Sequence, residues 1–118
     1  MANTFKVVTN DAMPASSGTL LTLYTCPSST TTVCLGLVLC NVHSTSVTAS
    51  VKLTSSTAGS NPNTNADVFL VKDVSIPSGS SLEVLSGSKV VLQTTDDIQI
   101  DCSVSAKIDA ALSVMEIT

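Results

Sequence analysis

Residues 32–42, with the sequence TVCLGLVLCNV, are apolar on both of the faces that an extended strand would present. Successive side chains of a strand point to opposite sides, so this stretch divides into two rows. The first row is bulky and contains Val33, Leu35, Leu37 and Leu39. The second row is mostly small and contains Cys34, Gly36, Val38, Cys40 and Val42. We expect the bulky row to fill a hydrophobic core, and the small row to form a flat surface that another protein can approach closely.

The composition favours strands and turns around this stretch. Ser and Thr account for 35 of the 118 residues, whereas the helix formers Glu, Lys and Arg total seven, a balance typical of β proteins. Residues 47–54 and 98–105 alternate apolar and polar side chains, and turn residues recur between such segments. We therefore predict an all-β protein: one antiparallel β-sandwich or jelly-roll-like domain, residues 1–118, with eight or nine short strands and a short N-terminal arm at residues 1–4.

Four segments carry more specific predictions. A short first strand is expected at residues 5–8, followed by a loop at 10–18, which is full of turn residues. A hairpin is expected to pair residues 82–85 with residues 89–93. The last segment, 108–117, contains Ala, Leu and Met but lacks helix caps, so we expect a strand there.

The loop at residues 55–66 has no apolar period and contains mostly turn-favouring residues. Loops of this length inside compact domains are either solvated connections or functional segments. We treat it as a candidate contact arm, represented by Asn61 and Asn63. Together with the small row of the central stretch, it defines a candidate assembly interface: Cys34, Gly36, Val38, Cys40, Asn61 and Asn63.

The charge balance excludes several classes of partner. The net charge is −4, with five Lys, no Arg, one Tyr, two Phe and no Trp. Nucleic-acid binding needs clustered basic residues and aromatic platforms, so we expect none. The longest apolar run, residues 33–40, is far shorter than the roughly 20 residues that span a bilayer, so we expect no membrane partner. Residues 1–6 do not resemble a signal peptide, which predicts synthesis and retention in a cytoplasm-like compartment.

The four cysteines do not indicate a metal site. Cys34 and Cys40 would share one face of a strand roughly 20 Å apart, whereas a zinc–sulfur bond is about 2.3 Å long. A disulfide between Cys40 and Cys102, or between Cys26 and Cys34, is an open alternative. Without a secretory signal, we expect free thiols that behave as small apolar residues in the core or at an interface.

Other polar residues give no active site. His43 lies in a predicted turn, and the Gly-x-Ser-x-Gly motif that positions a nucleophile is missing from the sequence. Asp96, Asp97 and Asp101 do not match the spacing of a calcium-binding loop, so we interpret them as solvated carboxylates of a hairpin turn. We therefore expect no catalytic residues, no bound metal and no cofactor.

Five segments resemble small virion structural proteins of tailed bacteriophages, notably those that infect cyanobacteria. They are MANTFKV (1–7), YTCPSSTTTV (24–33), IPSGSSLEVL (76–85), GSKVVL (87–92) and LSVMEIT (112–118). The likeness spans nearly the whole chain and implies a non-enzymatic part of a virion, made in the host cytoplasm. Cys26, Cys34 and Cys40 depart from the pattern, where Val, Thr or Asn is expected.

Within that class, the leading hypothesis is a capsid decoration (cement) protein that stabilises the shell by bridging capsid subunits. Its expected partners are further copies of itself, as a homo-oligomer such as a trimer, and the major capsid protein or another virion protein. The alternative is a neck, tail or fibre-associated component of the same particle. Hypotheses from two other classes are a receptor-binding or carbohydrate-binding module that uses Tyr24, and a small hydrolase that uses His43.

Overall fold

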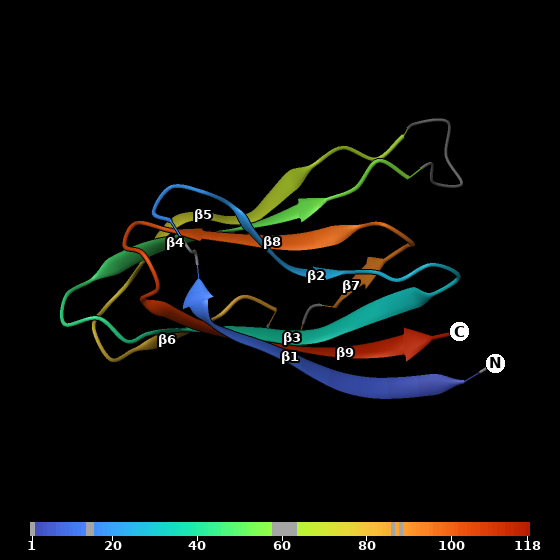
Figure 1. Cartoon of the computed structure of the whole chain (residues 1–118), viewed down its shortest axis with the longest axis horizontal. Coiled ribbons are helices and arrows are strands. Elements are labelled where there is room, and N and C mark those ends of the chain that lie inside the picture. Colours follow the sequence, from blue (N-terminus) through green and yellow to red (C-terminus); the bar gives the residue numbers. More distant parts are fainter. Residues whose placement is uncertain (1, 14–15, 58–63, 86, 88) are drawn as a thin grey trace.

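The computed structural model describes residues 2–13, 16–57, 64–85, 87 and 89–118, and within them the chain is all-β (Figure 1). No helix occurs in these ranges, so none could cross a membrane. The described strands are β1 (Asn3–Met13), β2 (Leu21–Thr25), β3 (Thr31–Asn41), β4 (Val47–Thr54), β5 (Val68–Ile76), β6 (Ser81–Glu83), β7 (Val90–Leu92), β8 (Asp97–Cys102) and β9 (Ile108–Ile117). The predicted all-β class and the number of strands are confirmed.

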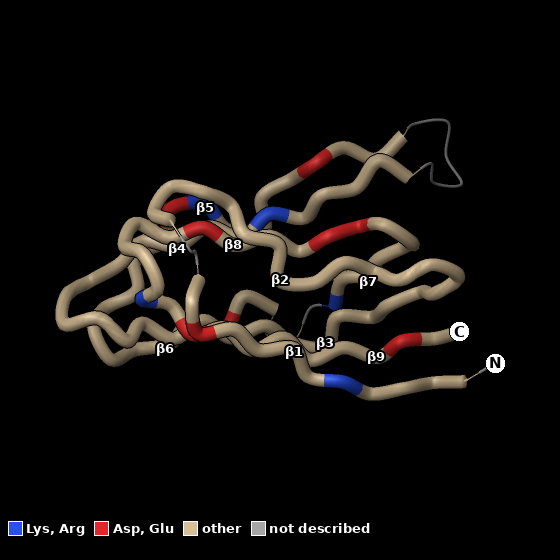
Figure 2. The backbone as a smooth tube through the Cα atoms, in the orientation of Figure 1, with Lys and Arg blue, Asp and Glu red and all other residues tan. Residues whose placement is uncertain are grey.

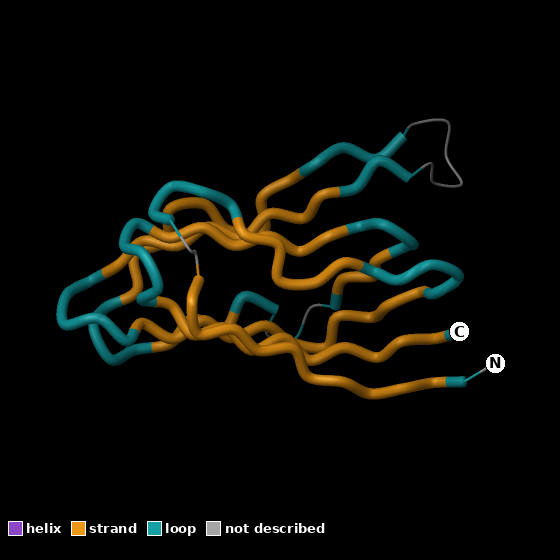
Figure 3. Tube along the Cα trace, viewed as in Figure 1, coloured by secondary structure: helices purple, strands orange, loops and turns teal. Residues whose placement is uncertain are grey.

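Two antiparallel sheets pack face to face as a sandwich (Figures 1 and 3). Sheet A has the order β1-β9-β3, and both β6 and β7 pair with the far edge of β3. Sheet B has the order β2-β8-β4-β5. Leu, Ile and Val side chains from both sheets fill the space between them, including Leu37, Leu39, Leu112, Val51 and Ile100.

Strand β9 explains why the last segment is not a helix. Its buried residues alternate along the strand as Ile108, Ala110, Leu112 and Val114. This period of two matches one face of a sheet, and both edges of β9 are hydrogen-bonded, to β1 and to β3. The predicted strand at 108–117 is therefore confirmed.

A β-bulge in β3 changes which side chains face the core. Cys34 pairs with Val114 and Gly36 with Ser113, so Leu35 is an extra residue without its own partner on β9. A bulge adds one residue to one strand and reverses the alternation beyond it. The core therefore receives Cys34 before the bulge and Leu37 and Leu39 after it. The prediction of one continuous bulky row was wrong, because it assumed strict alternation through Leu35.

Three local predictions also require correction. The first strand extends over Asn3–Met13, so the second half of the expected arm and the start of the expected loop belong to β1. Asn3 pairs with Ile117 and Thr4 with Glu116, which explains why residues 3 and 4 are not a free arm. The segments expected to form a hairpin, β6 and β7, lie one after the other along β3 and pair with it at separate places.

A polar cluster joins the two sheets near one end of the sandwich. The Tyr24 hydroxyl donates a hydrogen bond of 2.6 Å to Glu116 and lies 2.8 Å from the Thr32 hydroxyl. Glu116 also forms an ion pair of 2.8 Å with Lys6 of β1. These contacts pair the buried polar groups on the inner side of sheet A, so that their burial is compensated.

Candidate assembly surface

The outer face of sheet A carries four of the exposed large apolar residues in the described part of the chain: Phe5, Val7, Val38 and Val91. Residues that pair directly in antiparallel strands point to the same side, so the register assigns the face. Phe5 pairs with Met115, Met115 with Val33, and Val33 with Val91, which gives an apolar row across four strands. Phe5 is 71% exposed, Val7 66% and Val91 56%, values that a sheet with no further cover would show.

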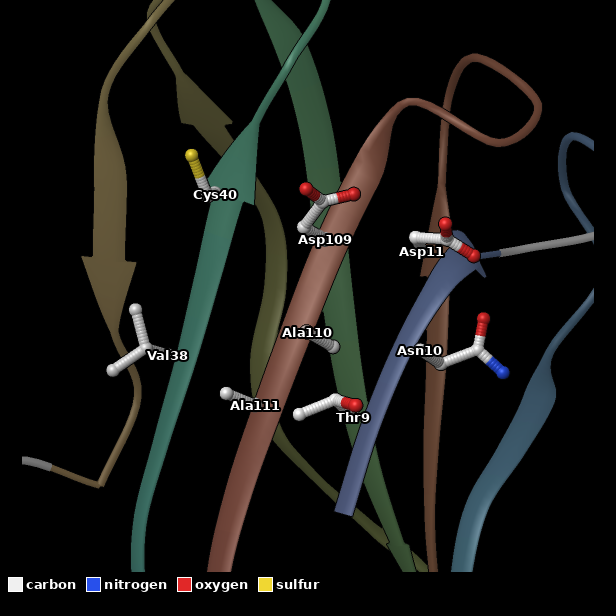
Figure 4. A pocket seen from close by; sticks show the side chains of 8 residues that line it. All are labelled: Thr9, Asn10, Asp11, Val38, Cys40, Asp109, Ala110 and Ala111. Atoms are coloured by element: carbon white, nitrogen blue, oxygen red, sulfur yellow. The ribbon is translucent and has the colours of Figure 1, made fainter. Parts of the chain in front are cut away.

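A second row at the other end of the face is formed by smaller and more polar residues. Thr9 pairs with Ala111, Ala111 with Val38, and Val38 with Glu83. This row borders a shallow hollow of about 550 Å³. Figure 4 shows Thr9, Ala111 and Val38 across three neighbouring strands, with Cys40 and Asp109 at one end.

Between these two rows lies a third, formed by Val7, Ser113 and Gly36. A Cβ atom built on Gly36 would meet no described atom within 4 Å, so nothing in the described chain packs against this position. Glycine is thus not required by the fold of the monomer at this site. Because Gly36 has no side chain, the outer face of sheet A is flat at this position.

Few residues of sheet A are charged (Figure 2), and one of them, Glu83 of β6, lies beside Val38 at the edge of this face. The strands β1, β3 and β9 contain four charged residues, which are Lys6, Asp11, Asp109 and Glu116. Lys6 pairs with the buried Val114 and therefore points inward, as does the buried Glu116. Asp11 and Asp109 border the hollow. The sheet thus has ionised groups inside and apolar groups outside at its Phe5 end.

The outer face of sheet B is polar. Its strands present Thr48 and Lys52 from β4, Gln99 and Asp101 from β8, and Ser75 from β5, as their pairing shows. Its exposed aromatic residue, Phe69, is covered by two cations, with the ammonium groups of Lys52 and Lys72 at 5.5 and 5.0 Å from the ring centroid. Such contacts shield the ring from further association.

The structure places the predicted interface residues in three different locations. Gly36, Val38 and Cys40 lie on the outer face of sheet A. Cys34 does not, because the bulge turns its side chain into the core, where it is fully buried. Asn61 and Asn63 lie outside the described residues.

Sequence reasoning missed the residues that contribute most to the exposed face: Phe5, Val7, Val91 and Met115. Phe5, Val7 and Thr9 alternate with Lys6 and Val8, a pattern that signals a strand with two different sides. That pattern does not say which side faces the core. The ion pair of Lys6 with Glu116 decides it, and this contact joins residues at opposite ends of the sequence.

All four cysteines are free. Burial raises the pKa of the Cys34 thiol to about 11 and, to a lesser extent, that of Cys102 above its usual range. Cys40 faces outward on sheet A whereas Cys102 lies in the core, so the alternative disulfide between them does not fit this fold. Buried thiols with raised pKa values are structural rather than reactive.

The remaining candidate residues have structural contacts. The backbone N–H of His43 donates to Asn41 Oδ1, and its carbonyl accepts from Ser78. Asp96 is buried and accepts a hydrogen bond from the Gln93 N–H, so its interpretation as a solvated carboxylate was wrong. Asp97 and Asp101 each have one buried oxygen without a partner among the described atoms. No group of three or more His, Cys, Asp or Glu that could hold a metal occurs in that part of the chain.

Tyr24 is also structural. Burial, with the hydrogen bond to Glu116, raises its pKa well above the usual value. The hydrogen bonds from Lys6 and Tyr24 lower the pKa of Glu116. Because the Tyr24 hydroxyl is held between the sheets, its ring does not offer the open platform that carbohydrate stacking needs.

Comparisons with known proteins leave the family open. No family model matches the chain, and a search of curated proteins also finds no match. Among solved structures, a chain from Bacillus endospore appendages, described as a novel family of disulfide-linked pili, is similar over 99% of this chain and 87% of its own. Its sequence identity is 13% and its TM-score is 0.48. A likeness at this level carries no argument about what the present chain does.

Proposed function

We propose that this protein is a non-enzymatic structural subunit of a bacteriophage virion, and within the particle a capsid decoration (cement) protein. The observation that carries the proposal is the apolar outer face of sheet A, with Phe5, Val7 and Val91 each more than half exposed. Contiguous exposed apolar patches mark interaction sites in soluble proteins. Burying this face against other protein would remove an unfavourable contact with water and stabilise the assembled state.

The polar groups of the molecule support a structural role. The groups with the most perturbed pKa values, Tyr24 and Cys34, lie between the sheets, where they hold or fill the sandwich. Active sites instead place such groups in accessible clefts. The hollow beside Thr9 and Ala111 has small, mostly uncharged walls and suits a side chain of a protein partner.

The phage part of the proposal is based on the five sequence segments described above, which resemble virion structural proteins. The preference for decoration over the neck, tail or fibre is based on size: a small β domain with one apolar face can bridge neighbouring shell subunits. Each contact adds to the stability of the shell through mass action.

The test uses particles of the phage whose genome encodes the chain. Mass spectrometry should find the protein in purified particles, and antibody labelling in the electron microscope should place it over the shell. Labelling confined to the neck, tail or fibres would contradict the decoration role and support the alternative, a neck, tail or fibre-associated component. Absence from the particles would refute the virion role.

A second experiment tests the face itself. Particles stripped of the protein are incubated with wild type, with Val7→Lys, or with the control Ser75→Lys on the outer face of sheet B. Val7→Lys should lose binding because it adds a charge to the apolar face through which the protein associates, whether that face contacts the shell or a second copy that binds the shell with it. Ser75→Lys should bind as wild type does. Equal binding by all three would show that another surface makes the contact.

A further inference from the structure

The outer face of sheet A has complementary features at its two ends. At one end Phe5 projects from the apolar row, and at the other end the hollow borders the row of Thr9, Ala111 and Val38. Phe5 and Thr9 are four residues apart on β1, a distance of about 13 Å. The row of Val7, Ser113 and Gly36 lies midway between the two.

We infer that this face binds a second copy of the chain about a two-fold axis that runs across the strands along the row of Val7, Ser113 and Gly36. The inference rests on the proposed assembly role of the same face and names its partner. A two-fold interface uses one patch twice, so each feature must meet its complement in the other copy. Rotation about this axis places the Phe5 row of each copy over the hollow row of the other.

The flat centre of the face permits this contact. Residues on a two-fold axis meet their own counterparts, so bulky side chains there would hold the two sheets apart. Gly36 has no side chain, and the space beside it is open. Ser113 is also small, so the axis is flat over β9 and β3. Val7 lies at the edge strand β1, where its apolar side chain meets that of the other copy.

The charges agree with this direction of the axis. Val90 pairs with Cys34, so the adjacent Lys89 lies close to the Gly36 row. Glu83 pairs with Val38, which is two residues beyond Gly36. In the dimer, Lys89 of each copy therefore lies within side-chain reach of Glu83 of the other. Asp109 is four residues from Ser113, so the two copies of Asp109 lie at opposite ends, separated by more than the screening length of about 8 Å. An axis parallel to the strands would instead bring them together.

The first experiment measures the mass of the purified protein by sedimentation velocity from micromolar to millimolar concentrations. Wild type should pass from monomer to dimer. Gly36→Glu places like charges opposite each other on the axis and should raise the dimer dissociation constant at least about hundredfold. Because the space at Gly36 is open, the monomer should fold normally, which circular dichroism and the melting temperature check. The matched control Ser75→Glu on sheet B should dimerise like wild type.

The second experiment tests the orientation through the edge charges. Each single variant leaves charges of only one sign along the dimer edge and should raise the dimer dissociation constant about tenfold. The two single variants are Lys89→Glu and Glu83→Lys. The double variant Lys89→Glu with Glu83→Lys restores the alternation and should return to within about threefold of wild type. Failure of the double variant to recover would overturn the proposed axis.

The failures of the two proposals are distinguishable. A wild type that stays monomeric at millimolar concentration overturns the two-fold contact, and the virion role then stands if the protein is found in particles. A dimer sensitive to Gly36→Glu supports the contact even if the protein is absent from particles, in which case only the virion role fails. A dimer insensitive to Gly36→Glu overturns the assignment of this face.

Discussion

The outer faces of the two sheets differ although both belong to one small sandwich. Sheet B follows the usual arrangement, with Thr, Ser, Lys, Gln and Asp toward solvent and its exposed ring at Phe69 covered by lysines. Sheet A is reversed at its Phe5 end, where Lys6 and Glu116 point inward and Phe5 and Met115 point outward. An arrangement that exposes apolar groups while burying the carboxylate of Glu116 lowers the stability of an isolated domain. This difference supports the proposed role of sheet A in association.

The largest expected effect is a difference in thiol labelling rate between the two sides of β3. Cys40 faces outward and should react with a thiol reagent in the dilute native protein, whereas Cys34 is buried and its pKa is raised to about 11. Labelling of Cys34 needs an opening that costs about 5 kcal/mol, so its rate should be roughly 4,000-fold lower. Mass spectrometry of labelled peptides measures both rates, and Cys40→Ser should remove the fast reaction. Equal rates at the two sites would contradict the bulge.

The next effect compares two leucines on either side of the bulge. Leu37 is in the core, so Leu37→Ala should lower the free energy of unfolding by about 2–5 kcal/mol. Leu35→Ala should cost less than about 1 kcal/mol, because Leu35 is the extra residue of the bulge and does not belong to the core cluster. Urea denaturation of the two variants gives both values. A larger loss of unfolding free energy for Leu35→Ala than for Leu37→Ala would instead support the simple alternation that the sequence suggests.

A smaller effect tests the ionised groups inside sheet A. Glu116→Gln should lower the free energy of unfolding by about 1–3 kcal/mol near pH 7, because the charged acceptor of Tyr24 and Lys6 is lost. The pKa of Glu116 is lower in the folded protein than its usual value of 4.5. Its contribution is therefore complete above that value and disappears as the pH falls through the folded pKa. The difference between wild type and variant should shrink accordingly in melts at decreasing pH, and a constant difference would exclude a role for the charge.

The smallest effect concerns the two ion pairs of the molecule's described residues. Lys6 is half exposed and joins Glu116, so Lys6→Met should cost no more than about 1 kcal/mol. Lys72 joins Asp73 in an exposed pair on β5, and Lys72→Met should have almost no effect on unfolding. Equal losses in the two variants would show that the inward direction of Lys6 adds nothing.

The sequence predicts the class of fold well because strand periodicity is a local signal. Residues 47–54 alternate apolar and polar side chains, and β4 has these bounds. Residues 98–105 alternate in the same way, and most of them lie in β8. The prediction for β3 was wrong for Val33, Cys34 and Leu35, since a bulge depends on the register with β9, which is set far away in the sequence. The same limit applies to the assembly surface. Gly36, Val38 and Cys40 were found from their small size, but Phe5 and Met115 required knowledge of which strands are neighbours.

The contact between Tyr24 and Glu116 gives the molecule a built-in spectroscopic reporter. Tyr24 is the only tyrosine, and the chain has no tryptophan. Ultraviolet emission beyond that of phenylalanine therefore originates from one ring, positioned where a strand of one sheet meets a strand of the other. Separation of the two layers can thus be followed in solution through the native fluorophore, without an attached dye.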